Sequence, residues 1–147
     1  MTQAAPIVFL NSFPGDSIGG GEVQLLSLVL GLMERGEDVV VAAAEGSRML
    51  EAARAIEGLD VYPVDFRAGS PTGIALSIAR DIPHAAIVVG TGFFANVVAR
   101  QLGVAIKSRI VNIAHVVPGA NRLQGEKWIS RLARWALEQD GVPVSAQ

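Results

Sequence analysis

Three glycines and a glutamate, Gly19-Gly20-Gly21-Glu22, form the segment of the sequence best suited to bind a ligand. The segment follows a short apolar stretch and precedes one with helical spacing, so we predict that it opens a helix. Glycine lets the backbone approach a ligand closely, and the first turn of a helix carries unpaired N–H groups with partial positive charge. The segment is therefore a candidate site for a phosphate group or a sugar ring. The alternative is a flexible turn in which Glu22 stabilises the helix start.

Two common phosphate-binding motifs do not fit this segment. A P-loop that begins at Gly15 would need Lys followed by Ser or Thr where Gly21 and Glu22 stand. The dinucleotide motif G-x-G-x-x-G, begun at Gly19, would need a third glycine where Gln24 stands. The sequence therefore excludes both motifs.

His115 is the second candidate, because it directly follows the apolar stretch Ile110–Ala114. An imidazole titrates near neutral pH, so it can share a proton with a substrate or bind a hydroxyl or phosphate group. The alternative is a histidine with a purely structural role. His84 precedes a predicted strand, at the wrong end of the sheet for a ligand, and is expected to be a solvated surface residue.

Small residues also follow another predicted strand, at Thr91 and Gly92. They open space at the end of the strand and are candidates for binding the same ligand. The alternative is an ordinary helix start with two core aromatic residues, Phe93 and Phe94.

Short apolar stretches alternate along the chain with longer stretches of helical spacing, in six repeats. The predicted strands are Ile7–Leu10, Val39–Ala44, Val61–Val64, Ala86–Val89, Ile110–Ala114 and Val142–Val144. The predicted helices are Glu22–Arg35, Ser47–Glu57, Thr72–Arg80, Phe94–Leu102 and Gln124–Gln139. Gly36, Gly58 and Gly103 follow three of these helices and are expected to cap them in a left-handed conformation.

Strands that are apolar on both faces are typical of a parallel sheet covered on both sides. We therefore predict an α/β fold with a Rossmann-like, doubly wound parallel sheet flanked by helices. Ligands of such sheets bind beyond the carboxyl ends of the strands, where the glycine segment, Thr91, Gly92 and His115 are expected to lie.

Composition excludes several classes of protein. The chain has 147 residues, 50% of them hydrophobic, and a formal net charge of -2, so it has the composition of a folded domain rather than of a disordered chain. An isoelectric point near 5.6 gives no general attraction to nucleic acid. Without cysteine there is no disulfide, thiolate metal site or cysteine nucleophile, and no metal is expected. The sequence has neither a membrane-spanning stretch nor a signal peptide, so the expected compartment is the cytoplasm.

The last predicted helix carries a basic face beside an apolar stripe. The basic residues are Lys127, Arg131 and Arg134, and the apolar residues are Trp128, Leu132 and Trp135. Such a helix can lie on an anionic membrane, so peripheral contact with the inner face of the membrane is one hypothesis. The alternative is a solvated face over a buried stripe.

Three segments carry a further pattern. Residues 19–28 and 31–41 form a glycine loop, a helix and a strand ending close to "L-x-x-x-G-H-x-V-x-V", with Glu37 in place of the frequent His. Residues 110–115 form a strand that ends in His, and residues 136–145 are similar to "A-D-x-V-x-x-S". In this order the segments resemble the N-terminal domain of the family-4 GT-B glycosyltransferases.

The resemblance implies an enzyme of two Rossmann-like domains that transfers a sugar, with retention, from a nucleotide-diphosphate sugar to a sugar, glycan or lipid acceptor. Residues 1–147 would form the N-terminal, acceptor-side domain. The C-terminal domain, which binds the nucleotide sugar, would be missing from this chain or separately encoded. By itself the chain is then expected to be inactive, with no cofactor besides the donor substrate.

The resemblance also implies roles for single residues. Gly19, Gly20 and Gly21 would approach the donor diphosphate or the acceptor, and His115 would contact the transferred sugar. Charge that develops on a leaving diphosphate can be stabilised by the N–H groups of a helix start. Two alternatives remain open: a non-catalytic Rossmann-like module that binds a phosphorylated metabolite or nucleotide, and a small flavodoxin-like or regulatory domain without a ligand.

Overall fold

The structure, a computed structural model, describes residues 5–113. Over this range five strands alternate with four helices. The strands are β1 Ile7–Asn11, β2 Val39–Ala44, β3 Asp60–Val64, β4 Ile87–Thr91 and β5 Arg109–Ile113. The helices are α1 Gly20–Glu34, α2 Arg48–Arg54, α3 Pro71–Asp81 and α4 Phe93–Ile106. The predicted alternation of strands and helices is confirmed over this range.

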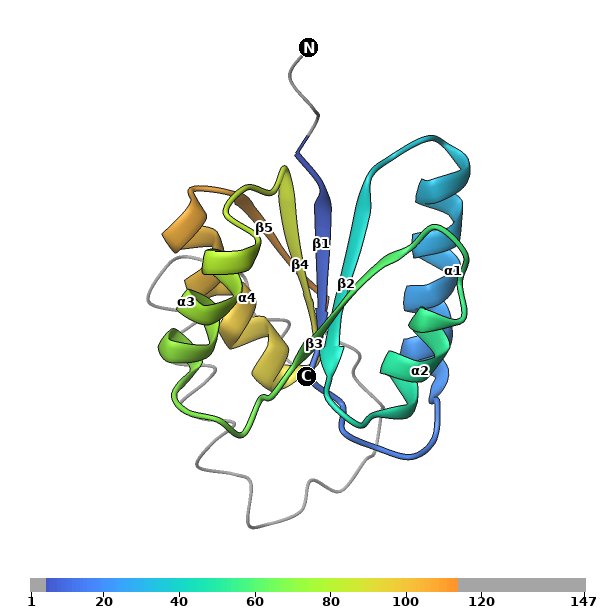
Figure 1. Ribbon diagram of the computed structural model, residues 1–147, viewed down its shortest axis with the longest axis horizontal. Helices are drawn as coiled ribbons and strands as arrows, with labels where there is room; N and C mark the ends of the chain where they lie inside the picture. The colour runs from blue at the N-terminus through green and yellow to red at the C-terminus, as the bar shows by residue number, and fades with distance from the viewer. Residues whose placement is uncertain (1–4, 114–147) are drawn as a thin grey trace.

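The five strands form one parallel sheet in the order β3-β2-β1-β4-β5. Helices α1 and α2 cover one face of the sheet, and α3 and α4 cover the other (Figure 1). The connection from β3 to β4 crosses the sheet, so β1 and β4 are neighbours at its centre although about 75 residues separate them in sequence. The predicted Rossmann-like, doubly wound sheet is confirmed.

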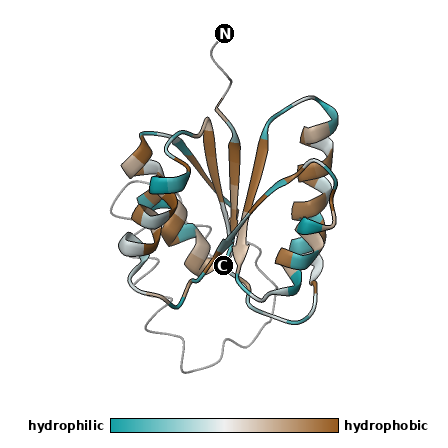
Figure 2. Ribbon diagram, viewed as in Figure 1, coloured by the Kyte–Doolittle hydropathy of each residue, from teal (hydrophilic) through white to brown (hydrophobic). Residues whose placement is uncertain are grey.

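Each face of the sheet has its own hydrophobic core. Along β1, Val8 and Leu10 pack toward α3 and α4, whereas Phe9 packs toward α1 and α2. This alternation follows from the strand period of two residues, and burial on both faces explains why the central strands are apolar up to their last residues (Figure 2).

One of the three predicted helix caps is confirmed. Gly36 has φ of +80° and directly follows Arg35, the C-cap of α1, and its N–H donates to the carbonyl of Met33 at 2.9 Å. Gly58 also has positive φ, but it lies in the connection to β3 because α2 ends at Arg54.

The prediction that Gly103 ends a helix is wrong. Helix α4 continues to Ile106, and Lys107 takes the left-handed conformation with φ of 55°. Gly103 is buried within the helix, and a Cβ added to it would lie 2.3 Å from Cγ1 of Ile110. Glycine at this position therefore allows α4 to pack closely against β5.

Two predicted elements, Gln124–Gln139 and Val142–Val144, lie outside the described residues, as does the basic face with Lys127, Arg131 and Arg134. Within residues 5–113, no helix is both long enough and apolar enough to cross a membrane.

Tyr62 on β3 is hydrogen-bonded to Asp81, the last residue of α3. Its hydroxyl donates a hydrogen bond to Oδ2 of Asp81. This bond, together with partial burial and the negative charge of Asp81, raises the pKa of Tyr62 above its ordinary value. The contribution to stability is therefore complete below the ordinary tyrosine pKa, and it is lost as the pH rises through the raised pKa.

Tyr62 is the only tyrosine of the chain, so the absorbance of its phenolate can be followed directly. We expect its titration midpoint to lie above that of a free tyrosine, and Asp81→Asn to lower the midpoint. Asp38→Asn, which changes an exposed carboxylate before β2, serves as the control. A midpoint that Asp81→Asn leaves in place would contradict the assignment.

Candidate functional site

The carboxyl ends of β1 and β4 meet at the centre of the sheet. Asn11 and Thr91, the last residues of these strands, are partners in the parallel register. After Asn11 the chain leads to α1 on one face of the sheet, and after Thr91 it leads to α4 on the other. The two connections diverge and leave a crevice between them, which is where doubly wound sheets bind ligands.

Asn11 and Thr91 form a buried framework beneath this crevice. They are 3% and 4% exposed, and Nδ2 of Asn11 donates to Oγ1 of Thr91 at 3.0 Å. The Thr91 hydroxyl donates to the carbonyl of Leu10 at 3.0 Å, and Oδ1 of Asn11 accepts from the N–H of Phe13 at 3.2 Å. Thr91, predicted from the sequence to bind the ligand, thus uses its hydroxyl to hold the two strand ends together. Asn11 was not singled out from the sequence, although a polar residue that ends an apolar strand is a usable signal.

The start of α4 is shaped by Gly92 and by a residue from the loop after β1. Gly92 has φ of +92° and ψ of 166°, a conformation that is accessible essentially only to glycine. It has no side chain to cap the helix, and Oγ of Ser12 accepts the N–H of Ala95 at 3.1 Å instead. The loop after β1 therefore supplies the cap of α4 and fixes the two sides of the crevice to each other.

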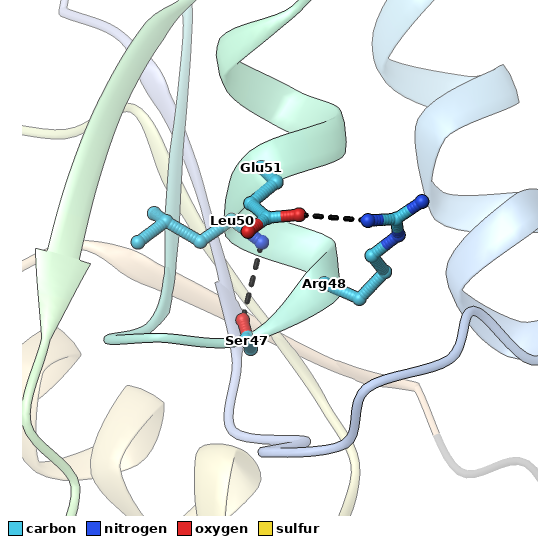
Figure 3. A network of polar contacts seen from close by, with 4 residues as sticks. All are labelled: Ser47, Arg48, Leu50 and Glu51. Atoms are coloured by element: carbon cyan, nitrogen blue, oxygen red, sulfur yellow. Dashed lines mark hydrogen bonds and ion pairs between the residues drawn. The ribbon is translucent and has the colours of Figure 1, made fainter.

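The loop after β1 is fixed on its far side by the start of α2. Buried Ser47 caps α2 by accepting the N–H of Leu50 at 3.1 Å, and exposed Arg48 pairs with Glu51 at 3.0 Å (Figure 3). The N–H of Arg48 donates to the carbonyl of Gly15 at 3.1 Å, which holds the middle of the loop.

Gly15 also leaves room for an aromatic ring of the loop. A Cβ on Gly15 would lie 2.4 Å from Cε1 of Phe13, so the ring packs directly against the backbone of Gly15. Phe13 nevertheless remains 44% exposed, and its ring borders the crevice.

The three glycines before α1 have different environments. Gly19 is the N-cap of α1, and its N–H donates to Oε2 of Glu22 at 3.0 Å. Gly20 is exposed, and a Cβ added to it would have nothing within 4 Å. Of the three, Gly21 lines the pocket of the crevice. Glu22 also lines it, and its hydrogen bond with the N–H of Gly19 stabilises this helix start, as the alternative interpretation of the segment predicts.

The crevice contains a pocket of about 490 Å³ between the loop after β1 and the starts of α1 and α4. Glu22 is the only ionisable side chain among the described residues that line it. Phe13 and Phe93 stand on its border with 44% and 43% of their surfaces exposed. The pocket thus offers aromatic surface, one carboxylate and backbone polar groups.

A serine motif at residues 15–19 does not form a nucleophile site. The residues read G-D-S-I-G, which fits the G-x-S-x-G pattern of serine hydrolases. That mechanism needs Ser17 on a sharp turn directly between a strand and a helix. Here β1 ends at Asn11 and α1 begins at Gly20, so Ser17 lies exposed within a longer loop.

Of the two histidines, only His84 lies within the described residues. His84 is exposed and precedes β4, at the amino edge of the sheet, as predicted. His115 lies outside the described residues. Strand β5 ends two residues before it at Ile113, which is in register with Thr91.

Among residues 5–113 no group of three or more His, Asp or Glu side chains is arranged to hold a metal ion. Comparison with models of known protein families gives no match, and comparison with curated proteins gives none either.

Proposed function

We propose that this chain forms the acceptor-side domain of a retaining glycosyltransferase, and that the pocket between β1 and β4 binds the sugar unit that receives the transferred residue. The donor is a nucleotide-diphosphate sugar, held by a second domain that completes the site. The observation that carries the proposal is the character of the pocket, where two exposed phenylalanines lie beside Glu22, the one carboxylate among the described lining residues.

A sugar ring matches these groups chemically. Its C–H faces are apolar and can cover Phe13 and Phe93, while its hydroxyl groups can donate to the carboxylate of Glu22. Pockets that combine apolar surface with a few well-placed polar groups are typical small-molecule sites. The hydrogen bond from Gly19 holds the Glu22 carboxylate at the border of the pocket, which favours a defined orientation of the ring.

A phosphate group matches the pocket less well. No lysine or arginine is present among its described lining residues, and Glu22 would repel an anion. Within the proposed enzyme, this favours the acceptor over the donor diphosphate as the ligand of Gly21 and its neighbours.

One observation favours a second candidate, a non-catalytic module that binds a phosphorylated metabolite or nucleotide. Helix α4 has no acidic residue in its first turn, and its first residues, Phe93 and Phe94, line the pocket. Its N-terminal N–H groups therefore provide partial positive charge that no side chain of that turn neutralises.

A ligand titration followed by amide resonances separates the two candidates. We expect monosaccharides, tested as a panel of hexoses and hexosamines, to shift the resonances of residues 11–22 and 91–94. Inorganic phosphate should leave them unchanged, because none of the described residues that line the pocket is basic. Shifts produced by phosphate and by none of the sugars would replace the glycosyltransferase with the binding module.

The same proposal predicts the effect of the two histidines on transfer. The chain is combined with a nucleotide-sugar-binding domain, and transfer to an acceptor is measured. His115→Ala is expected to lower kcat by about a hundredfold, the effect of losing a positioned group at the reacting sugar. His84→Ala, at the opposite edge of the sheet, is the matched control and should leave kcat unchanged. Equal kcat values for the two variants would remove His115 from the site.

A further inference from the structure

A second hollow adjoins the pocket between β1 and β4. It has a volume of about 460 Å³ and lies beyond the carboxyl ends of β2 and β3. Ser12, Pro14 and Phe94 line both hollows, so together they form one groove along the carboxyl edge of the sheet. The β1–β4 pocket is its first part, and the hollow over β2 and β3 is its second part.

The second part of the groove presents charged side chains and an aromatic pair. Glu45 directly follows β2, and Asp65 directly follows β3. Oδ1 of Asp65 accepts the N–H of Arg67 at 3.0 Å, which fixes the turn that carries both side chains. Phe66 meets Phe94 edge to face, with ring centroids 6.0 Å apart, and so joins this turn to the start of α4.

The charged groups of the second part are available to a ligand. Glu45 and Arg67 are exposed, and within residues 5–113 neither side chain takes part in an ion pair. A carboxylate accepts hydroxyl or ammonium protons, whereas a guanidinium donates to hydroxyl oxygens. The hollow therefore offers both kinds of partner to a polyhydroxylated ring.

The charge of the whole groove restricts the ligand further. Its described lining residues include three carboxylates, those of Glu22, Glu45 and Asp65, against the single guanidinium of Arg67. Carboxylates close to one another repel a further anion, and repulsion is strongest where a ligand excludes water.

We propose that the two parts of the groove bind one acceptor, a glycan of at least two sugar units that carries no anionic group. The terminal unit lies in the β1–β4 pocket beside Glu22, and the next unit lies between Glu45 and Arg67. Neutral and amino-substituted sugars fit this charge, whereas uronic acids and sulfated sugars do not. The inference rests on the proposed function, because it names the class of acceptor for the same site.

The test compares mono- and disaccharides on the full chain. Affinities are measured by amide resonances for hexoses, hexosamines and hexuronic acids of gluco, galacto and manno configuration. At least one neutral or amino disaccharide is expected to bind about tenfold more tightly than its monosaccharide, since one added unit brings its own contacts. Hexuronic acid disaccharides should show no such gain.

Two variants test which part of the groove provides the higher affinity of the disaccharide. Replacement of both Glu45→Gln and Asp65→Asn should remove the tenfold advantage of the disaccharide and leave the affinity of the monosaccharide unchanged. Glu22→Gln should weaken binding of both ligands. All three substitutions keep the size of exposed or half-buried side chains, so the fold is expected to persist and can be checked by the unchanged resonances of α2.

The outcomes distinguish the two proposals. Equal affinity for mono- and disaccharides in the wild-type chain, or a hexuronic acid as the tightest ligand, overturns the two-unit acceptor and leaves the proposed function in place. Binding of none of the sugars overturns both.

Discussion

Alanine at position 90 is expected to lower the free energy of unfolding by roughly 3 kcal/mol, the upper part of the range for overpacking a core. Gly90 lies on β4 directly beneath the first turns of α4. An added Cβ would lie 2.8 Å from Cα of Asn96 and 3.0 Å from the carbonyl oxygen of Ala95. These are backbone atoms, so the helix as a whole would have to move away from the sheet. A melting temperature lower by on the order of 10 °C is the expected reading in a thermal scan.

Gly20→Ala is the matched control for this substitution. Gly20 is in the first turn of α1, and a Cβ there would meet nothing within 4 Å. Alanine also favours helix more than glycine does, so the control should be as stable as the wild type or slightly more stable. If the Gly90→Ala variant melts at the same temperature as this control, α4 does not pack on β4 as described.

Thr91→Val is expected to lower the free energy of unfolding by about 2 kcal/mol, the cost of leaving buried polar groups without partners. Valine keeps the shape of threonine but removes the hydroxyl. Nδ2 of Asn11 then loses its acceptor, and the carbonyl of Leu10 loses a donor, both in a part of the site that is almost completely buried. Urea denaturation followed by circular dichroism measures the loss.

Thr91→Ser separates the hydroxyl from the methyl group. Serine keeps the hydroxyl and deletes one methyl, so the expected loss is about 1 kcal/mol or less. Adding Asn11→Leu to Thr91→Val should cost less than the sum of the two single changes, since the two side chains bond to each other. Equal losses for valine and serine would show that the hydroxyl does not hold the strands together.

These two predictions concern how the site is supported rather than what it binds. Gly90 lets α4 approach the sheet, and Thr91 holds the end of β4 against the end of β1. Thr91 is one of the candidate site residues predicted from the sequence, whereas Gly90, directly before it, was not singled out. The sequence predicts open space for a ligand at Thr91 and Gly92, and both residues line the pocket. The Thr91 hydroxyl is nevertheless bonded to Asn11 and Leu10, and Asn96 occupies the space beside Gly90.

The glycine segment before α1 shows the same limit of sequence analysis. The sequence marks Gly19, Gly20 and Gly21 equally as candidate ligand-binding residues, because each one lets the backbone approach a ligand closely. The folded chain separates them: Gly19 is held by Glu22, Gly20 faces open space and Gly21 borders the pocket. The role of His115 stays a prediction, because it lies beyond the described residues.

The sequence by itself determined the alternation of strands and helices and the parallel sheet, because burial on both faces leaves apolar strands and local spacing marks the helices. It also predicts the edge of the sheet at which a site would form. The tertiary structure alone decided that β1 and β4 are neighbours, that Ser12 caps α4 and that Asn11 bonds to Thr91 across 80 residues of chain. Local patterns do not fix the strand order. The polar residues of β3 and β5 mark these strands as less buried than β1, β2 and β4, but they do not say which strands are neighbours. The order arises only when the crossover from β3 to β4 brings distant segments into contact, and the candidate site is made of those contacts.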